Sequence, residues 1–232
     1  MLFVTKGKKI NPSVPIKIGD EIINRVHETK FFGIIIDDKL NWSYHIAKVK
    51  NKISKGLGIL WKVKRLINET TMLTLYYSFI YPYLHYGIMA WGKADATYLD
   101  SLFKLQKRAV RLVSSAKRLA HTKPLFKKLK LLKLSDIYIL NIMLFMFKFR
   151  HSLLPQVFDG MFVLNRDVHN YFTRQFDMYH YLTWRLQMRK KSIRIQGPII
   201  WNQLVLHFDY NCTIVTFKFH VKNYLLVNDI EI

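Results

Sequence analysis

The sequence predicts an α+β protein that is mainly α, with a short β-hairpin or sheet remnant, a helical bundle and a mixed, mostly helical C-terminal region. Half of the 232 residues are apolar, which is enough for a substantial buried core. Extended, turn-containing segments come first in the chain, as in a hairpin. From Trp42 onward, apolar residues instead recur every three or four positions, which is typical of helices with one buried face.

Three segments near the N-terminus have β patterns. Residues 2–5 are predicted to form a strand, and residues 15–18 and 21–23 a tight hairpin around Gly19 and Asp20. Residues 29–36 are an apolar run, which favours a strand that is buried on both faces. Because so few strands cannot cover their own apolar faces, we expect them to be the edge of a larger sheet.

Two long helices are expected between residues 42 and 116. The first is predicted to begin at Trp42 or Ser43, with Ser43 as a good N-cap, and its apolar stripe includes Ile46, Val49, Ile53, Leu57 and Leu60. A second long helix is expected after Ala94 and Asp95. Basic side chains lie off the two apolar stripes, at Lys48, Lys52, Lys55, Lys62, Lys104, Lys107, Arg108 and Arg111. If the helices pack together, these eight side chains can form one positive surface.

Between these helices, residues 70–92 carry no charged side chain, so their length alone would allow a membrane span. Pro82 interrupts the segment, and its five tyrosines have hydroxyls that would lack partners in lipid. We therefore expect a pair of helices that starts at Asn68, is broken at Pro82 and is buried in the bundle.

The character of the sequence changes after residue 117. We expect a short basic amphipathic segment at residues 125–132 and an apolar helix at 137–149, capped by Ser135 and Asp136. Residues 159–196 look irregular. Further helices are predicted to start at Gly197 and Pro198 and to cover residues 216–226. The predicted domains are therefore 1–41, 42–116 and 117–232.

The charge of the chain points to an anionic partner. Lys and Arg number 37 against 15 Asp and Glu, which gives a formal net charge of +22. Nucleic acid is the first candidate partner, and an anionic membrane surface is the alternative. The only cysteine, Cys212, excludes an internal disulfide and fits a reducing, intracellular compartment, either nuclear or cytoplasmic.

The sequence offers no clear catalytic constellation. Asp37 and Asp38 are the only adjacent acidic pair, but neighbouring side chains on a strand point to opposite faces, so we expect one of them to cap the turn that follows. His45, His85 and His121 are predicted to be packing or surface residues, because their spacing does not suit metal ligands. We predict no catalytic residue, no metal site and no small-molecule substrate.

Several separate blocks resemble one protein family. They are residues 1–3, residues 31–37 with 40–42, residues 75–92, residues 105–111, residues 169–174 and residues 197–204. In this order they are similar to the end of the palm, the thumb and the post-polymerase region of non-LTR (LINE-type, jockey-like) retrotransposon reverse transcriptases. Val205 departs from the family, which usually has proline after the Trp201-Asn202 block.

The resemblance implies an RNA-directed DNA polymerase, with Phe31, Phe32 and Gly33 as primer-grip-like residues and 42–116 as a thumb-like bundle. It also implies that the eight basic residues bind an RNA or DNA template-primer duplex, and that this binding is independent of sequence. The family's catalytic aspartate motifs have no counterpart here, so we expect a truncated, inactive fragment, and Mg²⁺ only in the intact polymerase. The alternatives are a stand-alone nucleic-acid-binding protein derived from the element, or a membrane-associated basic protein.

Overall fold

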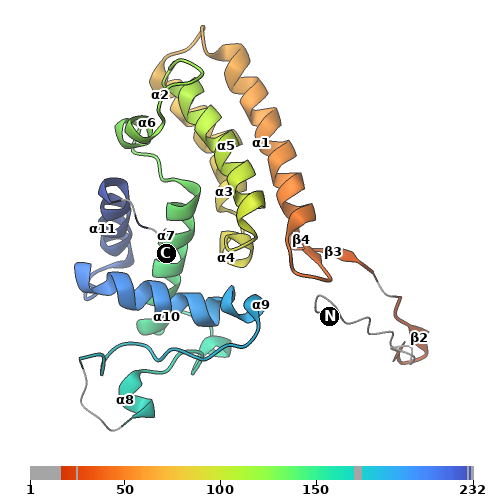
Figure 1. Ribbon diagram of the computed structural model, residues 1–232, viewed down its shortest axis with the longest axis vertical. Helices are drawn as coiled ribbons and strands as arrows, with labels where there is room; N and C mark the ends of the chain where they lie inside the picture. The colour runs from red at the N-terminus through yellow and green to blue at the C-terminus, as the bar shows by residue number, and fades with distance from the viewer. Residues whose placement is uncertain (1–16, 25, 170–173, 229, 231–232) are drawn as a thin grey trace.

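The computed structural model describes residues 17–24, 26–169, 174–228 and 230. It is mainly helical, with two small antiparallel hairpins before the helices, so the predicted fold class is confirmed (Figure 1). The predicted strand at 2–5, the block at residues 1–3 and most of the block at 169–174 lie outside the described residues.

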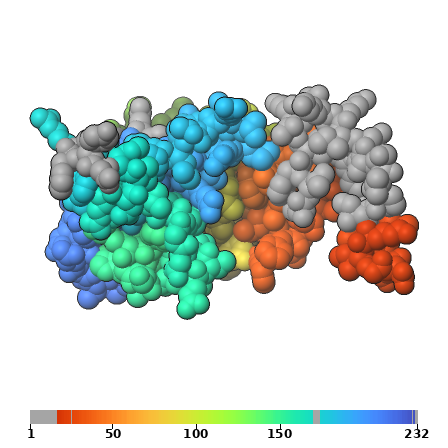
Figure 2. All heavy atoms as spheres, turned by 90° about the horizontal axis from the view of Figure 1, so that it is seen from below, coloured from red at the N-terminus to blue at the C-terminus, as the bar shows by residue number. Residues whose placement is uncertain are grey.

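The first hairpin consists of β1 (Lys17–Ile18) and β2 (Glu21–Ile22), as predicted. Lys17 pairs with Ile22 and Ile18 with Glu21, while Gly19 adopts a φ of +61° in the turn. Glycine reaches this left-handed conformation without the steric cost that a Cβ would add. Both strands are exposed, and in Figure 2 they form one end of the molecule, drawn in red.

The prediction of one buried strand at residues 29–36 is wrong. The segment folds back on itself as β3 (Glu28–Phe31) and β4 (Ile34–Asp37), and β3 is exposed along its whole length. The turn residues Phe32 and Gly33 have φ values of +43° and +81°. Two successive positive values match the two-residue type I′ turn, whose twist suits a hairpin. Gly33 permits this turn, which cannot be recognised from the apolar run at residues 29–36 alone.

Five helices follow these hairpins. They are α1 (Ser43–Val63), then α2 (Glu69–Phe79), α3 (Tyr81–His85) and α4 (Ile88–Trp91), then α5 (Ala96–Val113). In Figure 1, α1 and α5 run side by side in the same direction, and α2, α3 and α4 lead the chain from the end of α1 back to the start of α5. The predicted apolar stripe of α1 is buried, as expected.

The starts of these helices differ in detail from the prediction. Ser43 is the first residue of α1 and not its N-cap, because the preceding Trp42 has a left-handed φ of +66°. The side chain of Asn41 instead accepts a hydrogen bond from the Ser43 N–H at 2.9 Å. Asn68 caps α2 as expected, since its Oδ1 accepts from the Thr71 N–H at 2.9 Å.

The uncharged segment at 70–92 is divided among α2, α3 and α4, with Pro82 in the first turn of α3. Tyr76 is fully buried, and its hydroxyl accepts a hydrogen bond from Gln106 Nε2 of α5 at 3.0 Å. Within the described part of the chain, none of the helices combines the length and the apolar character needed to cross a membrane.

The C-terminal elements are α6 (Lys123–Lys128), α7 (Leu134–Arg150), η1 (Gln156–Phe158), α8 (Asn165–Val168), α9 (Gln187–Lys190), α10 (Ile193–Leu204), η2 (Val205–His207) and α11 (Ile214–Val227). Residues 159–196 are therefore more regular than predicted. Gly197 and Pro198 lie inside α10 and do not start it. The helix can begin earlier because Ser192 O accepts from the Gln196 N–H at 2.9 Å, so Pro198 removes only one later hydrogen bond.

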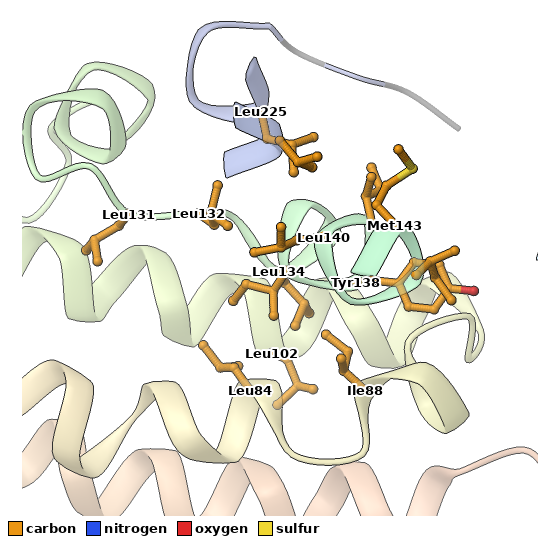
Figure 3. Packing of buried hydrophobic residues seen from close by; sticks show 14 of the residues in the cluster. Leu84, Ile88, Leu102, Leu131, Leu132, Leu134, Tyr138, Leu140, Met143 and Leu225 are labelled. Carbon is orange, nitrogen blue, oxygen red and sulfur yellow. The ribbon is translucent and has the colours of Figure 1, made fainter. Parts of the chain in front are cut away.

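One hydrophobic core runs through the whole helical part of the chain. Figure 3 shows α7 between two sets of apolar side chains, with Leu84, Ile88 and Leu102 on one side and Leu225 of α11 on the other. Residues before and after position 117 therefore share this core. The division into 42–116 and 117–232 stays a prediction.

Asn202 fixes the segment that precedes α9. Its Oδ1 accepts from the Tyr179 N–H at 3.1 Å, and its Nδ2 donates to Tyr179 O at 2.8 Å. All of these groups are buried, so Asn202→Ala is expected to lower the free energy of unfolding by about 1–3 kcal/mol, measured by urea denaturation. Asn202→Asp retains the acceptor but places a buried carboxylate oxygen against Tyr179 O, so it should lose at least as much. Equal stability of Asn202→Ala and the wild type would contradict this assignment.

Candidate nucleic-acid interface

Asp37 organises the junction between β4 and α1. Its buried carboxylate accepts hydrogen bonds from the backbone N–H groups of Lys39 and Asn41, each at 3.1 Å, and of Trp42 at 2.8 Å. The predicted capping role of this acidic pair is confirmed. Asp38 instead approaches His27 Nδ1 at 3.3 Å. In the ranges that the structure describes, no three His, Cys, Asp or Glu side chains are grouped so that they could hold a metal ion.

The primer-grip-like residues form the tip of the β3–β4 hairpin. Phe31 and Phe32 are 59% and 77% exposed, and their rings meet edge to face with centroids 4.4 Å apart. The Tyr86 hydroxyl donates a hydrogen bond to Phe32 O and so ties the tip to the end of α3. This contact joins two sequence blocks that are 54 residues apart.

Gly87 allows this close approach. It has a φ of +62°, and a Cβ at this position would lie 2.4 Å from Ile34 Cδ1, which is far inside van der Waals contact. Trp91 is buried behind it and donates through Nε1 to Tyr86 O at 3.0 Å. The hairpin tip is therefore held against the corner between α3 and α4.

A groove of about 400 Å³ lies beside the hairpin tip, between α1 and α3. Its lining residues are Gly33, His45, Lys48, Val49, Lys52, Pro82, Tyr83, His85 and Tyr86. The structure thus brings one primer-grip-like residue, Gly33, together with two of the predicted binding lysines, Lys48 and Lys52. Aromatic walls beside two ammonium groups suit a ligand that has both flat apolar surfaces and negative charge.

His45 forms the floor of this groove as a buried, neutral side chain. Its Nδ1 lies 3.3 Å from the Ile35 N–H, from which it accepts a hydrogen bond, and its ring centroid is 5.7 Å from that of Trp91. Burial, and then the ammonium group of Lys48, lower the pKa of His45. His45 is a packing residue, as predicted.

The lowered pKa makes stability depend on pH. Below about pH 6.5 the unfolded chain binds a proton at this position more readily than the folded chain, so stability falls as the pH decreases. Each unit by which the pKa is lowered contributes about 1.4 kcal/mol to this loss. We expect His45→Gln to reduce the decrease in Tm between pH 7.5 and 5.5. An unchanged decrease would show that His45 is not responsible.

The basic side chains of α5 differ in their surroundings. Lys104 and Arg108 are exposed, whereas the Lys107 ammonium lies 4.3 Å from the centroid of the Phe103 ring. Arg111 Nε donates to Ala120 O at 2.8 Å, so its guanidinium also holds the loop after α5. Lys107 and Arg111 therefore combine any binding role with a structural one.

Arg108 also lines a second cavity, of about 190 Å³, between α5 and α1. The other lining residues belong to α1 and are Ser54, Leu57, Gly58 and Trp61. The structure thus places Lys48 and Lys52 at the groove near the hairpin tip and Lys55 and Lys62 farther along the exposed stripe of α1. Of the four predicted residues on α5, Arg108 lies at this seam. Sequence reasoning missed Tyr86, Gly58 and Trp61. Gly58 could have pointed to the seam, because a glycine within a long predicted helix often has a packing or functional reason.

Comparison with known proteins supports the family resemblance. The chain is 25% identical over 136 residues to the RNA-directed DNA polymerase from mobile element jockey of Drosophila melanogaster, which is 57% of this chain and 15% of that protein. The jockey polymerase of Drosophila funebris is 26% identical over 137 residues, with the same coverage. The probable RNA-directed DNA polymerase from transposon BS of Drosophila melanogaster is 25% identical over 130 residues, covering 49% of this chain and 14% of that protein.

This chain resembles these polymerases over about half of its length. The matched region is at most 15% of each of them, so their activity as whole proteins does not transfer directly. No family model matches the chain, and no solved structure matches it.

Proposed function

We propose that this chain is part of a polypeptide related to LINE-type RNA-directed DNA polymerases, and that its hairpin tip and α1–α5 bundle bind a template-primer duplex. The observation that carries the proposal is the groove in which Gly33 meets Lys48 and Lys52. The lysine stripe of α1 continues from this groove through Lys55 to Lys62, and these last two residues are exposed.

Phosphate contacts explain how such a surface would bind. Lys and Arg that neutralise backbone phosphates release condensed counterions, which gives affinity without sequence preference and a steep dependence on salt. The excess of basic over acidic residues in the chain provides this attraction. The site of action would be the nucleus or the cytoplasm, where such duplexes occur.

We further propose that the chain binds nucleic acid but does not transfer nucleotides by itself. Two-metal catalysis needs carboxylates that converge on ions about 3.5–4 Å apart. The Asp37 carboxylate is engaged by three backbone N–H groups, and Asp38 faces His27. Mg²⁺ and the catalytic aspartates would then belong to a complete polymerase, of which this chain is a fragment.

The proposal is tested with fluorescently labelled duplexes of two unrelated sequences, as DNA and as RNA–DNA hybrid, between 50 and 200 mM salt. We expect equal affinities for both sequences and a linear fall of log K with log salt. Primer extension with Mg²⁺ or Mn²⁺ should be absent. A salt-independent affinity would overturn the binding proposal, and extension that disappears in the Asp37→Asn, Asp38→Asn variant would overturn the proposed inactivity.

A further inference from the structure

The seam between α1 and α5 has features that duplex binding along the lysine stripe does not use. Trp61 is 58% exposed although it is the largest type of apolar side chain, and it borders the cavity of about 190 Å³. Gly58 lies one turn earlier on α1, and apart from its chain neighbours and the adjoining helix backbone nothing lies within 4 Å of the position that its Cβ would occupy. The missing side chain therefore leaves the space beside Trp61 open.

Polar and charged groups surround this open space. Arg108 reaches it from α5, and Ser54 lies one turn before Gly58 on α1. The Lys64 ammonium is 5.8 Å from the centroid of the Trp61 ring, and Lys62 is exposed next to it in the chain. The space of about 190 Å³ is large enough to admit a flat heterocycle.

We propose that this seam seats one unpaired base of a single-stranded nucleic acid, with the base stacked on Trp61. In this arrangement Arg108 binds an adjacent phosphate and the Ser54 hydroxyl meets the edge of the base. The inference rests on the proposed function, because the basic bundle must first attract nucleic acid. It goes beyond that function, because the bases inside a duplex are already stacked and cannot enter the seam.

Charge and shape together favour a nucleic acid as the occupant. An aromatic ring flanked by cations matches the alternation of flat bases and phosphates along a single strand. Stacking tolerates any base because every base has a π-face, so the seam would recognise single-strandedness and not sequence. The lysine stripe would be enough to bind the phosphates, so phosphate binding alone does not require the seam.

The first experiment compares a labelled oligo-dT with an abasic oligonucleotide of the same length and charge. The wild type should bind oligo-dT more tightly, by about 5- to 150-fold, which is the range expected for stacking of one base. Trp61→Leu should abolish this preference, and Trp61→Phe should retain much of it. All three proteins should bind duplex DNA equally well.

A second variant tests the seam without removing the aromatic ring. Gly58→Leu adds a side chain that points into the open space, and replacing a helical glycine by leucine favours the helix. We expect this variant to melt at or above the wild-type temperature while losing the preference for oligo-dT. Gly58→Ala is the matched control, because its single methyl group leaves most of the cavity open and should retain the preference.

The outcomes separate this inference from the proposed function. Normal duplex binding with equal affinity for oligo-dT and the abasic strand would overturn the seam and leave duplex binding intact. Retention of the preference in Gly58→Leu, whose side chain fills the cavity, would show that the cavity is not where the base sits. A wild type that binds neither duplex nor single strand would overturn both proposals.

Discussion

Replacement of Lys52, Lys55, Lys62 and Lys104 together by Gln is expected to lower the slope of log K against log salt by about 3 to 4 units. Each contact with a phosphate of duplex DNA contributes about 0.9 to that slope, so four lost contacts give this value. All four side chains are exposed, and none belongs to the buried stripes of α1 or α5. The change should therefore spare the fold, which circular dichroism and thermal melting can verify.

The choice of these four lysines follows from the structure. Lys107 packs on the Phe103 ring and Arg111 holds Ala120 O, so replacing either would mix binding with stability. A matched control with the same loss of charge is Lys130, Lys148, Arg174 and Arg189 replaced by Gln, since these side chains are also exposed but lie outside α1 and α5. If the control set lowers the slope as much, the charge acts globally and the assigned binding face is wrong.

Asp37→Ala is expected to lower the free energy of unfolding by about 3 to 4 kcal/mol, the largest effect that we expect for a single residue. Hydrogen bonds to a charged group stabilise a protein by about 1.5–3 kcal/mol each, and their contributions are not fully additive. The variant leaves three backbone N–H groups in the turn from Lys39 to Trp42 without their acceptor. Urea denaturation measures the loss.

Asp38→Ala is the natural comparison, because it removes the neighbouring carboxylate. Its partner His27 is 81% exposed and Asp38 itself 15%, so solvent screens this contact in part and we expect a smaller loss than for Asp37→Ala. Asp37→Asn should fall between the two, since the amide oxygen can replace only part of the carboxylate. Equal losses for Asp37→Ala and Asp38→Ala would mean that the turn does not depend on Asp37.

The helices could be predicted because their pattern is local. A buried stripe such as Ile46, Val49 and Ile53 repeats with the helical period regardless of what packs against it. The β3–β4 hairpin could not be predicted in the same way. Its turn depends on a left-handed Phe32, which is supported by the Tyr86 hydroxyl from a distant part of the chain.

The same distinction holds for the candidate site. Periodicity alone separates the α1 lysines from the buried stripe, so their common exposed side was predictable. The groove at Gly33 and the seam at Trp61 each need two elements that only the tertiary structure brings together. Pro198 was misinterpreted as a helix start for a different reason, since the hydrogen bond from the Gln196 N–H to Ser192 O, which begins α10 earlier, is local.

The fit of Gly87 against Ile34 also limits how this sequence can diverge. A methyl group added at position 87 would occupy the space of the Ile34 side chain, so the two positions are not free to change independently. Any side chain at 87 would be strained by the φ of +62° and would have to displace the end of the Ile34 side chain. A substitution at position 87 therefore affects the hairpin as well as the α3–α4 corner.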